Sequence, residues 1–199
     1  MSIVGQPTGV EAASPSAWNI ANALTTLRFA LVPVFGWLLL THDGEVDAYR
    51  IAAFIVFGVA VATDRLDGDI ARRRGLVTDF GKIADPIADK ALTGMAFVGV
   101  SLLGDLPWWV TVAVLVREWG VTAVRFWVIR YGVMAAGAGG KLKTLLQSLA
   151  LGAYILPLSG WLHEVAAVFM AVAVVVTLVT GADYLRHALR LRRGGFLAP

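Results

Sequence analysis

Six long apolar stretches are the feature of this sequence that most restricts its fold. They cover approximately residues 18–40, 49–71, 81–104, 108–131, 142–161 and 165–189. A bilayer core takes about 20 apolar residues per helical crossing, so each stretch is long enough to cross a membrane. We therefore expect an all-α integral membrane protein whose single domain, 18–193, has six transmembrane helices. A flexible cytosolic leader at 1–17 precedes this domain, and a short tail at 194–199 follows it.

Composition narrows the class of function. Hydrophobic residues make up 58% of the 199 residues and charged residues only 16%. The formal net charge is +3, but the basic residues lie beside apolar runs. This arrangement favours anionic lipid or phosphate partners over nucleic acid. The sequence has no cysteine, which excludes disulfides, a thiol nucleophile and Cys-ligated zinc.

The distribution of basic residues predicts the orientation of the chain. Short cytoplasmic loops hold an excess of Lys and Arg. Basic residues gather around 72–82, around 130–141 and after 186, whereas the other loops are mainly acidic and Arg50 is their one basic exception. We therefore expect both termini and the active site to face the cytoplasm, in the plasma or inner membrane.

Two pairs of aspartates lie in or beside the second and third apolar stretches. Asp64 and Asp67 are three residues apart and Asp85 and Asp89 are four apart, so each pair projects from one face of its helix. A charge at mid-bilayer costs roughly 2.5–3.5 kcal/mol, which something must offset. If the pairs converge, their oxygens suit Mg²⁺ or Mn²⁺. Alternatively, the acids cap helix ends and pair with neighbouring bases.

The full pattern from Asp64 to Asp89 reads D-x-x-D-G-x-x-A-R-x8-G-x-x-x-D-x-x-x-D. It resembles the signature of the CDP-alcohol phosphotransferase family, and the resemblance covers the whole six-helix span. In this family a hydroxyl attacks a CDP-activated lipid or alcohol, and CMP leaves. The resemblance implies that Asp89 is the general base on the acceptor hydroxyl. It also implies a centre of two Mg²⁺ or Mn²⁺ ions held by Asp64, Asp67, Asp85 and Asp89.

The resemblance extends to the first apolar stretch. Residues 21–28 are similar to the family's P-N-x-L-T-x-x-R opening, with Ala21 where Pro is common. Arg28 is expected to pair with a motif acid or to form a structural ion pair. The implied CDP-diacylglycerol-binding residues are Asn22, Thr25, Gly68, Arg72 and Thr78.

Four basic residues of the fourth and fifth stretches are candidates for binding the acceptor. Arg117 and Arg125 are eight residues apart and share a helix face, and Lys141 and Lys143 lie in a G-K-x-K-T segment. A basic pocket beside the acids suits a phosphate on the acceptor. Both segments are similar to those of the family branch that makes phosphatidylglycerol phosphate. Alternatively, the lysines are only positive-inside anchors, and Glu118 pairs with one of the arginines.

We therefore expect an enzyme that transfers the phosphatidyl group of CDP-diacylglycerol to glycerol 3-phosphate, giving phosphatidylglycerol phosphate and CMP. Membrane lipids are expected partners, and a homodimer is left open. Another acceptor also stays open, as in cardiolipin synthase or phosphatidylinositol phosphate synthase. Outside the family, intramembrane acids also mark ion pathways, which keeps a divalent-cation transporter as an alternative. The acids lie at one end of two helices, which argues against it.

Overall fold

The computed structural model describes residues 20–74, 78–128 and 138–194. Within these ranges the chain forms six α-helices and one short 3-10 helix, so the all-α prediction is confirmed there. The predicted leader at 1–17 lies outside the described residues, as does the tail beyond Gly194. The elements are α1 (Ile20–Leu40), η1 (Thr41–Gly44), α2 (Asp47–Arg74), α3 (Asp79–Leu102), α4 (Trp108–Val128), α5 (Ala138–Ile155) and α6 (Trp161–Gly194).

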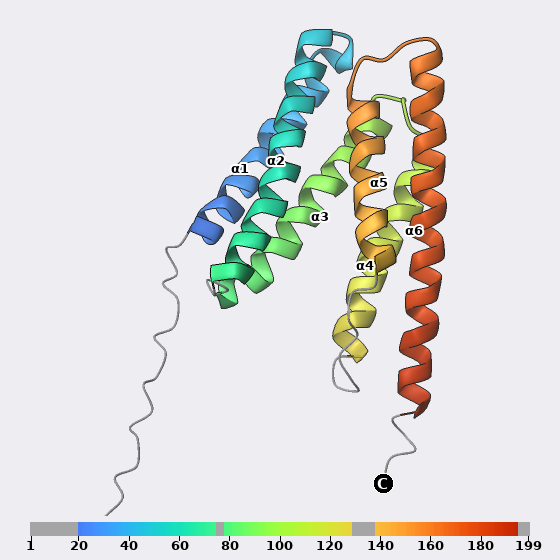
Figure 1. Ribbon diagram of the computed structural model, residues 1–199. Helices are drawn as coiled ribbons and strands as arrows, with labels where there is room; N and C mark the ends of the chain where they lie inside the picture. Colours follow the sequence, from blue (N-terminus) through green and yellow to red (C-terminus); the bar gives the residue numbers. More distant parts are fainter. Residues whose placement is uncertain (1–19, 75–77, 129–137, 195–199) are drawn as a thin grey trace, which may run out of the picture.

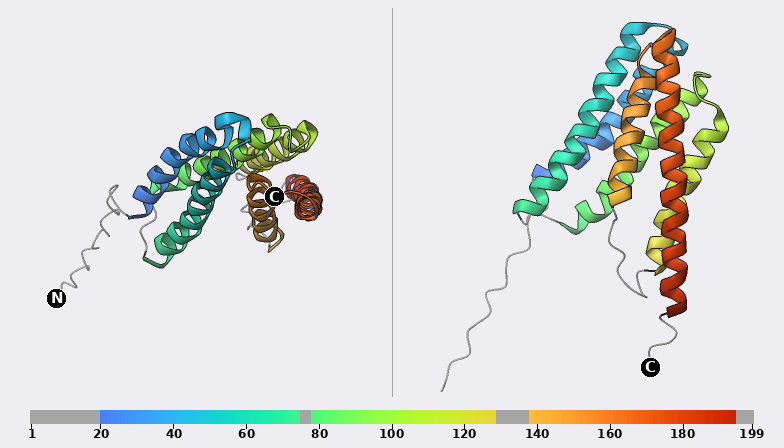
Figure 2. Two further views of the ribbon diagram at one scale, coloured as in Figure 1. Left: turned by 90° about the horizontal axis from the view of Figure 1, so that it is seen from above. Right: turned by 45° about the vertical axis from the view of Figure 1, so that its right-hand side comes forward.

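Successive α-helices run antiparallel between two ends of the bundle (Figure 1). Seen from above, α1, α3 and α4 lie on one side and α2, α5 and α6 on the other (Figure 2). Helix α1 packs on α2 and α3, α6 packs on α4 and α5, and α3 contacts α5 across the middle. The start of α1 and the end of α6 lie at the same end, where the α1–α3 group diverges from the α4–α6 group (Figure 1). We call this the open end.

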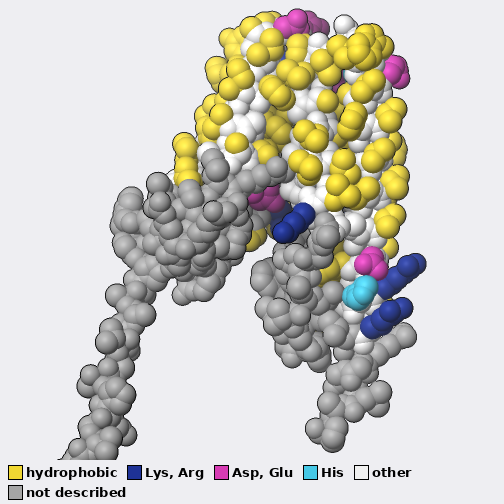
Figure 3. Space-filling view, in the orientation of Figure 1, with side chains coloured by type: hydrophobic (Ala, Val, Ile, Leu, Met, Phe, Trp, Pro, Cys, Tyr) yellow, Lys and Arg dark blue, Asp and Glu magenta, His cyan; other side chains and the backbone are white. Residues whose placement is uncertain are grey.

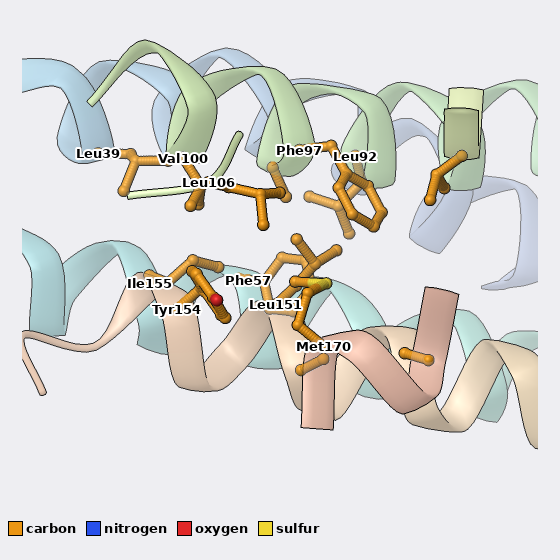
Figure 4. Close-up of a cluster of buried hydrophobic side chains, with 14 of the residues drawn as sticks. Leu39, Phe57, Leu92, Phe97, Val100, Leu106, Leu151, Tyr154, Ile155 and Met170 are labelled. Atoms are coloured by element: carbon orange, nitrogen blue, oxygen red, sulfur yellow. The ribbon is translucent and has the colours of Figure 1, made fainter. Parts of the chain in front are cut away.

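The hydrophobic core lies between the two sides. Phe97 and Val100 of α3 face Phe57 of α2 and Leu151 of α5 (Figure 4). Helices α1 and α3 approach closely because a Cβ at Gly99 would lie 2.6 Å from Leu39 Cδ2. Small residues at such crossings allow tight van der Waals packing, which drives helix association inside a bilayer.

The outer surface is apolar over a broad band. Trp37 and Val116 are 63% and 67% exposed. Hydrophobic side chains cover most of the upper part of the visible face, and few charged groups interrupt them there (Figure 3). Two segments of the described chain, Asn22–Gly44 and Trp161–Arg190, are long and apolar enough to cross a membrane. The helical architecture is consistent with a membrane protein, and the number of six crossings stays a prediction.

Arg50 clamps the end of the bundle opposite the open end. Its Nη2 donates to Asp105 Oδ2 and to the Tyr154 carbonyl oxygen, both at 2.6 Å, and its Nε donates to the Ile155 carbonyl oxygen at 2.9 Å. The last carbonyls of a helix lack intrahelical partners, so the end of α5 offers acceptors to a guanidinium. These hydrogen bonds explain why Arg50 lies at the end of the bundle where the sequence predicts mainly acidic loops.

Several helices extend beyond the apolar stretches that predicted them, among them α5 and α6. Helix α5 begins at Ala138 and not at 142, and α6 runs to Gly194 and not to 189. Hydropathy marks only the apolar part of a helix, whereas residues with good helix propensity, such as Arg and Leu, continue α6 into the polar surroundings. Lys141 and Lys143 consequently lie inside the first turns of α5.

Candidate active site

Helix α1 carries a polar face directed into the bundle. Asn22, Thr25 and Arg28 are spaced by three residues, so they lie on the same side of the helix. All three are buried, and Arg28 is completely inaccessible. Buried polar groups need partners to offset the loss of water, and α2 and α3 supply them.

An ion pair joins α1 to α2. Arg28 Nη1 lies 2.9 Å from Asp64 Oδ1, and the Asp64 side chain keeps about a third of its surface exposed, at 34%. A buried guanidinium requires a close carboxylate, because removing one partner leaves an uncompensated charge. The prediction that Arg28 pairs with a motif acid is therefore confirmed, and Asp64 is held in place by this contact.

A second set of contacts joins α1 to the start of α3. Thr78 caps α3 by accepting from the Gly81 amide at 3.1 Å, and its hydroxyl donates to Asn22 Oδ1 at 2.8 Å. The Thr25 hydroxyl donates to Asp85 Oδ1. A Cβ at Gly81 would lie 3.2 Å from Asn22 Oδ1 and 3.4 Å from Thr78 Oγ1, so glycine keeps these oxygens close together. Gly81 thus forms the floor of an oxygen-lined cradle at the N-terminus of α3.

The motif acids come from α2 and α3. Asp64 lies toward the end of α2, and Asp85 and Asp89 lie one turn apart on α3. Asp67, Gly68 and Arg72 also belong to α2, but their side chains lie outside the described part of the structure. Among the side chains that are described, no three or more Asp, Glu, His or Cys residues converge as a metal site.

The chemistry of the donors nevertheless fits a divalent cation. Asp64 and Asp85 offer carboxylate oxygens, and each is oriented by a residue of α1. Hard cations such as Mg²⁺ prefer oxygen donors and are usually completed by waters and substrate phosphates. The cradle around Gly81 adds further oxygens beside Asp85.

A pocket between α3, α4 and α5 lies next to the acids. Residues that line it include Asp89, Lys90, Glu118, Lys143 and Gln147. Asp89 lies one turn from Asp85 on α3. It also lines this pocket, which contains the buried cation of Lys143.

Lys143 and Lys141 have different surroundings, although only two residues separate them. Lys143 is 7% exposed and its Nζ donates to Glu118 Oε1 at 2.6 Å, whereas Lys141 lies on the surface. Side chains two positions apart on a helix point to different faces. The structure therefore brings Lys143 into the pocket and leaves Lys141 at its outside.

Arg117 is directed from α4 toward α6. Its Nη1 donates to Glu118 Oε1, its Nε to the Thr177 carbonyl oxygen and its Nη2 to Thr180 Oγ1, each at 2.9 Å. Glu118 therefore binds both Arg117 and Lys143, and the predicted pairing of Glu118 with one of the two arginines is confirmed. The side chain of Arg125, also on α4, lies outside the described residues.

Sequence reasoning assigned no role to α6, yet two of its threonines belong to this network. Gln147 Nε2 donates to Thr177 Oγ1 at 2.9 Å, beside the contacts of Arg117 with α6. Thr177 and Thr180 are three residues apart in a very apolar helix, and this spacing could have identified the polar face of α6 in the sequence. Threonine alone is too common in apolar helices for that signal to be specific.

Comparison with known proteins gives consistent likenesses. The family model for CDP-alcohol phosphatidyltransferase matches residues 18–179. A protein of Mycobacterium tuberculosis named probable phosphatidylglycerophosphate synthase is 51% identical over 96% of this chain and 91% of its own length. Two proteins named CDP-diacylglycerol–glycerol-3-phosphate 3-phosphatidyltransferase are each 34% identical to this chain. The match to the protein of Bacillus subtilis covers 84% of this chain and 93% of that protein. The match to the protein of Escherichia coli covers 86% of this chain and 95% of that protein. The family match spans the acidic helices and the basic ones.

Proposed function

Because this chain belongs to the CDP-alcohol phosphatidyltransferase family, we propose that it transfers the phosphatidyl group of CDP-diacylglycerol to glycerol 3-phosphate. The products are phosphatidylglycerol phosphate and CMP. The observation that carries the choice of acceptor is the pocket in which Asp89 and the buried Lys143 lie together. An acceptor with a hydroxyl and a phosphate needs an acid–base group for the first and a cation for the second.

The CDP group of the donor binds at the open end, against the cradle at the start of α3. Asn22, Thr25 and Thr78 offer side-chain oxygens there, and Gly81 allows the oxygens of Asn22 and Thr78 to lie close together. Gly68 and Arg72 of α2 complete the contacts, with Arg72 supplying a guanidinium for a phosphate oxygen.

Asp64, Asp67, Asp85 and Asp89 hold the divalent cations, two Mg²⁺ or Mn²⁺ ions. When bound, such ions neutralise phosphate charge and stabilise the leaving CMP. The protein's own contribution is to fix the ligands, because Arg28 orients Asp64 and Thr25 orients Asp85. Interactions of this kind around metal ligands set their direction and basicity.

Asp89 accepts the proton of the acceptor hydroxyl. The hydroxyl oxygen forms a bond to the phosphorus of the phosphatidyl group, and the bond from that phosphorus to the CMP oxygen breaks, with CMP taking the electron pair. A general base must lie within hydrogen-bond reach of the proton that it removes. Asp89 satisfies this for an acceptor bound in the pocket that it lines.

The acceptor phosphate is bound by Lys143 from inside the pocket. An ammonium has three N–H donors, so one bond to Glu118 leaves two for phosphate oxygens. Arg117 has five N–H groups and uses three of them in contacts with Glu118 and α6. Two N–H groups therefore remain to donate to the acceptor phosphate. Arg125 and Lys141 add positive charge from α4 and α5.

The chain crosses the plasma membrane six times, with both termini and the active site on the cytoplasmic side. The apolar band supports this arrangement, as do the exposed Arg186 and Arg190 on the part of α6 nearest the open end. Bases at short cytoplasmic segments are typical of multi-pass proteins.

The test is CMP release by the detergent-purified protein, supplied with CDP-diacylglycerol and Mg²⁺ and with one acceptor at a time. Glycerol 3-phosphate, inositol phosphate, inositol, serine and phosphatidylglycerol are compared. Release that depends on glycerol 3-phosphate is expected. Release with another acceptor alone would refute the proposed acceptor, and no release with any would refute the proposed reaction.

A further inference from the structure

Helix α6 determines where the Arg117 side chain lies. The guanidinium donates to the Thr177 carbonyl oxygen and to Thr180 Oγ1, each at 2.9 Å. The Thr180 hydroxyl in turn donates to the Val176 carbonyl oxygen at 2.7 Å, which fixes its lone pairs toward Arg117. A hydrogen bond to a charged group is stronger than one between neutral groups.

Gly181 provides the space for this arrangement. A Cβ at Gly181 would lie 2.8 Å from both Cγ and Nε of Arg117. Such contacts involve the middle of the Arg117 side chain, so any larger residue at 181 would force the whole side chain into another rotamer. The side chain of Arg117 therefore lies directly over the α6 backbone at Gly181.

The contacts continue from Arg117 to the pocket. Arg117 Nη1 donates to Glu118 Oε1 at 2.9 Å, and the same oxygen accepts from Lys143 Nζ at 2.6 Å. Lys143 and Glu118 line the pocket together with Asp89. A displacement of Arg117 would remove one of the two cations that hold Glu118, and Lys143 would move with its partner.

We propose that Thr180 and Gly181 are positioning residues of the acceptor pocket, acting through Arg117 and Glu118 on Lys143. The inference rests on the proposed function, because it takes the pocket as the site of the acceptor phosphate. The two residues touch no substrate. Their effect is confined to the acceptor, because the cradle for the CDP group is built from α1 and α3.

The test compares Gly181→Ala and Thr180→Val with the conservative Thr180→Ser and with Gly58→Ala. Gly58 lies on α2 with open space beside it, since no atom lies within 4 Å of the position that a Cβ would occupy. For each variant, kcat and the KM values for glycerol 3-phosphate and CDP-diacylglycerol are measured, together with the thermal midpoint in detergent.

Gly181→Ala and Thr180→Val should raise the KM for glycerol 3-phosphate by about three- to tenfold, because each displaces Arg117 and so weakens the binding of the acceptor phosphate by Lys143 indirectly. The KM for CDP-diacylglycerol should stay within about twofold of the wild type. Thr180→Ser keeps the hydroxyl and should retain the wild-type KM, and Gly58→Ala should match the wild type. Thr180→Val adds no bulk, so it tests the inference even if Gly181→Ala does not fold.

An active wild type with unchanged acceptor KM in both variants would overturn the inference and leave the proposed function intact. Equal increases in both KM values, or a lowered thermal midpoint alone, would overturn it as well, because they indicate a purely structural contact between α4 and α6. A wild type that releases no CMP with glycerol 3-phosphate would refute the proposed function, and this inference with it.

Discussion

Lys143 Nζ lies 2.6 Å from Glu118 Oε1, inside a pocket that Asp89 also lines. This contact joins α5 to α4 and holds a buried ammonium in the same pocket as Asp89 of α3. Burying an ammonium is costly unless it is paired, so Glu118 allows a cation to be kept at this depth. The pocket thereby combines a carboxylate and a cation, which is the pair that the proposed phosphorylated acceptor requires.

Replacing Arg28 by Met should destabilise the protein. The substitution removes the ion pair with Asp64. Because the Asp64 side chain is 34% exposed, the loss should be smaller than the roughly 3–5 kcal/mol of a fully buried pair. Thermal unfolding in detergent should show a clearly lowered midpoint, while Leu27→Ala on the exposed side of α1 should not. A midpoint equal to that of the wild type would contradict the role given to this pair.

Replacing Gly81 by Ala should weaken binding of CDP-diacylglycerol. The added Cβ would lie 3.2 Å from Asn22 Oδ1, so the oxygens of the cradle must separate. We expect the KM for CDP-diacylglycerol to rise by about five- to tenfold, with little change for glycerol 3-phosphate. Gly120→Ala, in open space on α4, is the matched control. An increase limited to the acceptor would place the CDP group elsewhere.

Removal of divalent cations should stop the reaction. With Asp64 and Asp85 oriented as oxygen donors, EDTA should abolish CMP release and added Mg²⁺ or Mn²⁺ should restore it. Asp85→Asn should need a higher Mg²⁺ concentration for half-maximal rate. Full turnover in EDTA would show that these acids serve another purpose.

Replacing Arg50 by Met should reduce stability without changing substrate binding. Arg50 makes three hydrogen bonds at the end opposite the open end, and hydrogen bonds to charged groups contribute about 1.5–3 kcal/mol each. Thermal midpoints and both KM values should be measured together. A changed KM for either substrate together with an unchanged thermal midpoint would contradict this structural role of Arg50.

Much of this architecture could be predicted from the sequence, because it depends on local periodicity. Apolar length predicts each of the six described helices, and the spacing of Asp85 and Asp89 places both on one face of α3. The family resemblance singles out Asn22, Thr25 and Arg28, and in the structure they form one polar face that contacts α2 and α3.

The contacts that depend on the exact start of a helix, or on distant segments, could not be predicted. Lys141 and Lys143 look equivalent in the sequence, and only the helical rotation of α5 decides which one is buried. Arg117 and Thr180 are 63 residues apart, and nothing in their local patterns relates them. In the sequence, Arg50 is an exception to the rule that basic residues lie on the cytoplasmic side. Its contacts with Asp105 and the end of α5 explain it, and they are visible only in the structure.

The most direct measurement is the KM for glycerol 3-phosphate of Lys143→Ala, determined beside the KM for CDP-diacylglycerol. Loss of the buried cation should raise the acceptor KM by at least about tenfold and leave the donor KM nearly unchanged. Leu149→Ala, an exposed position on the same helix, should behave as the wild type. An unchanged acceptor KM in Lys143→Ala would mean that the acceptor phosphate binds outside the pocket of Asp89 and Lys143.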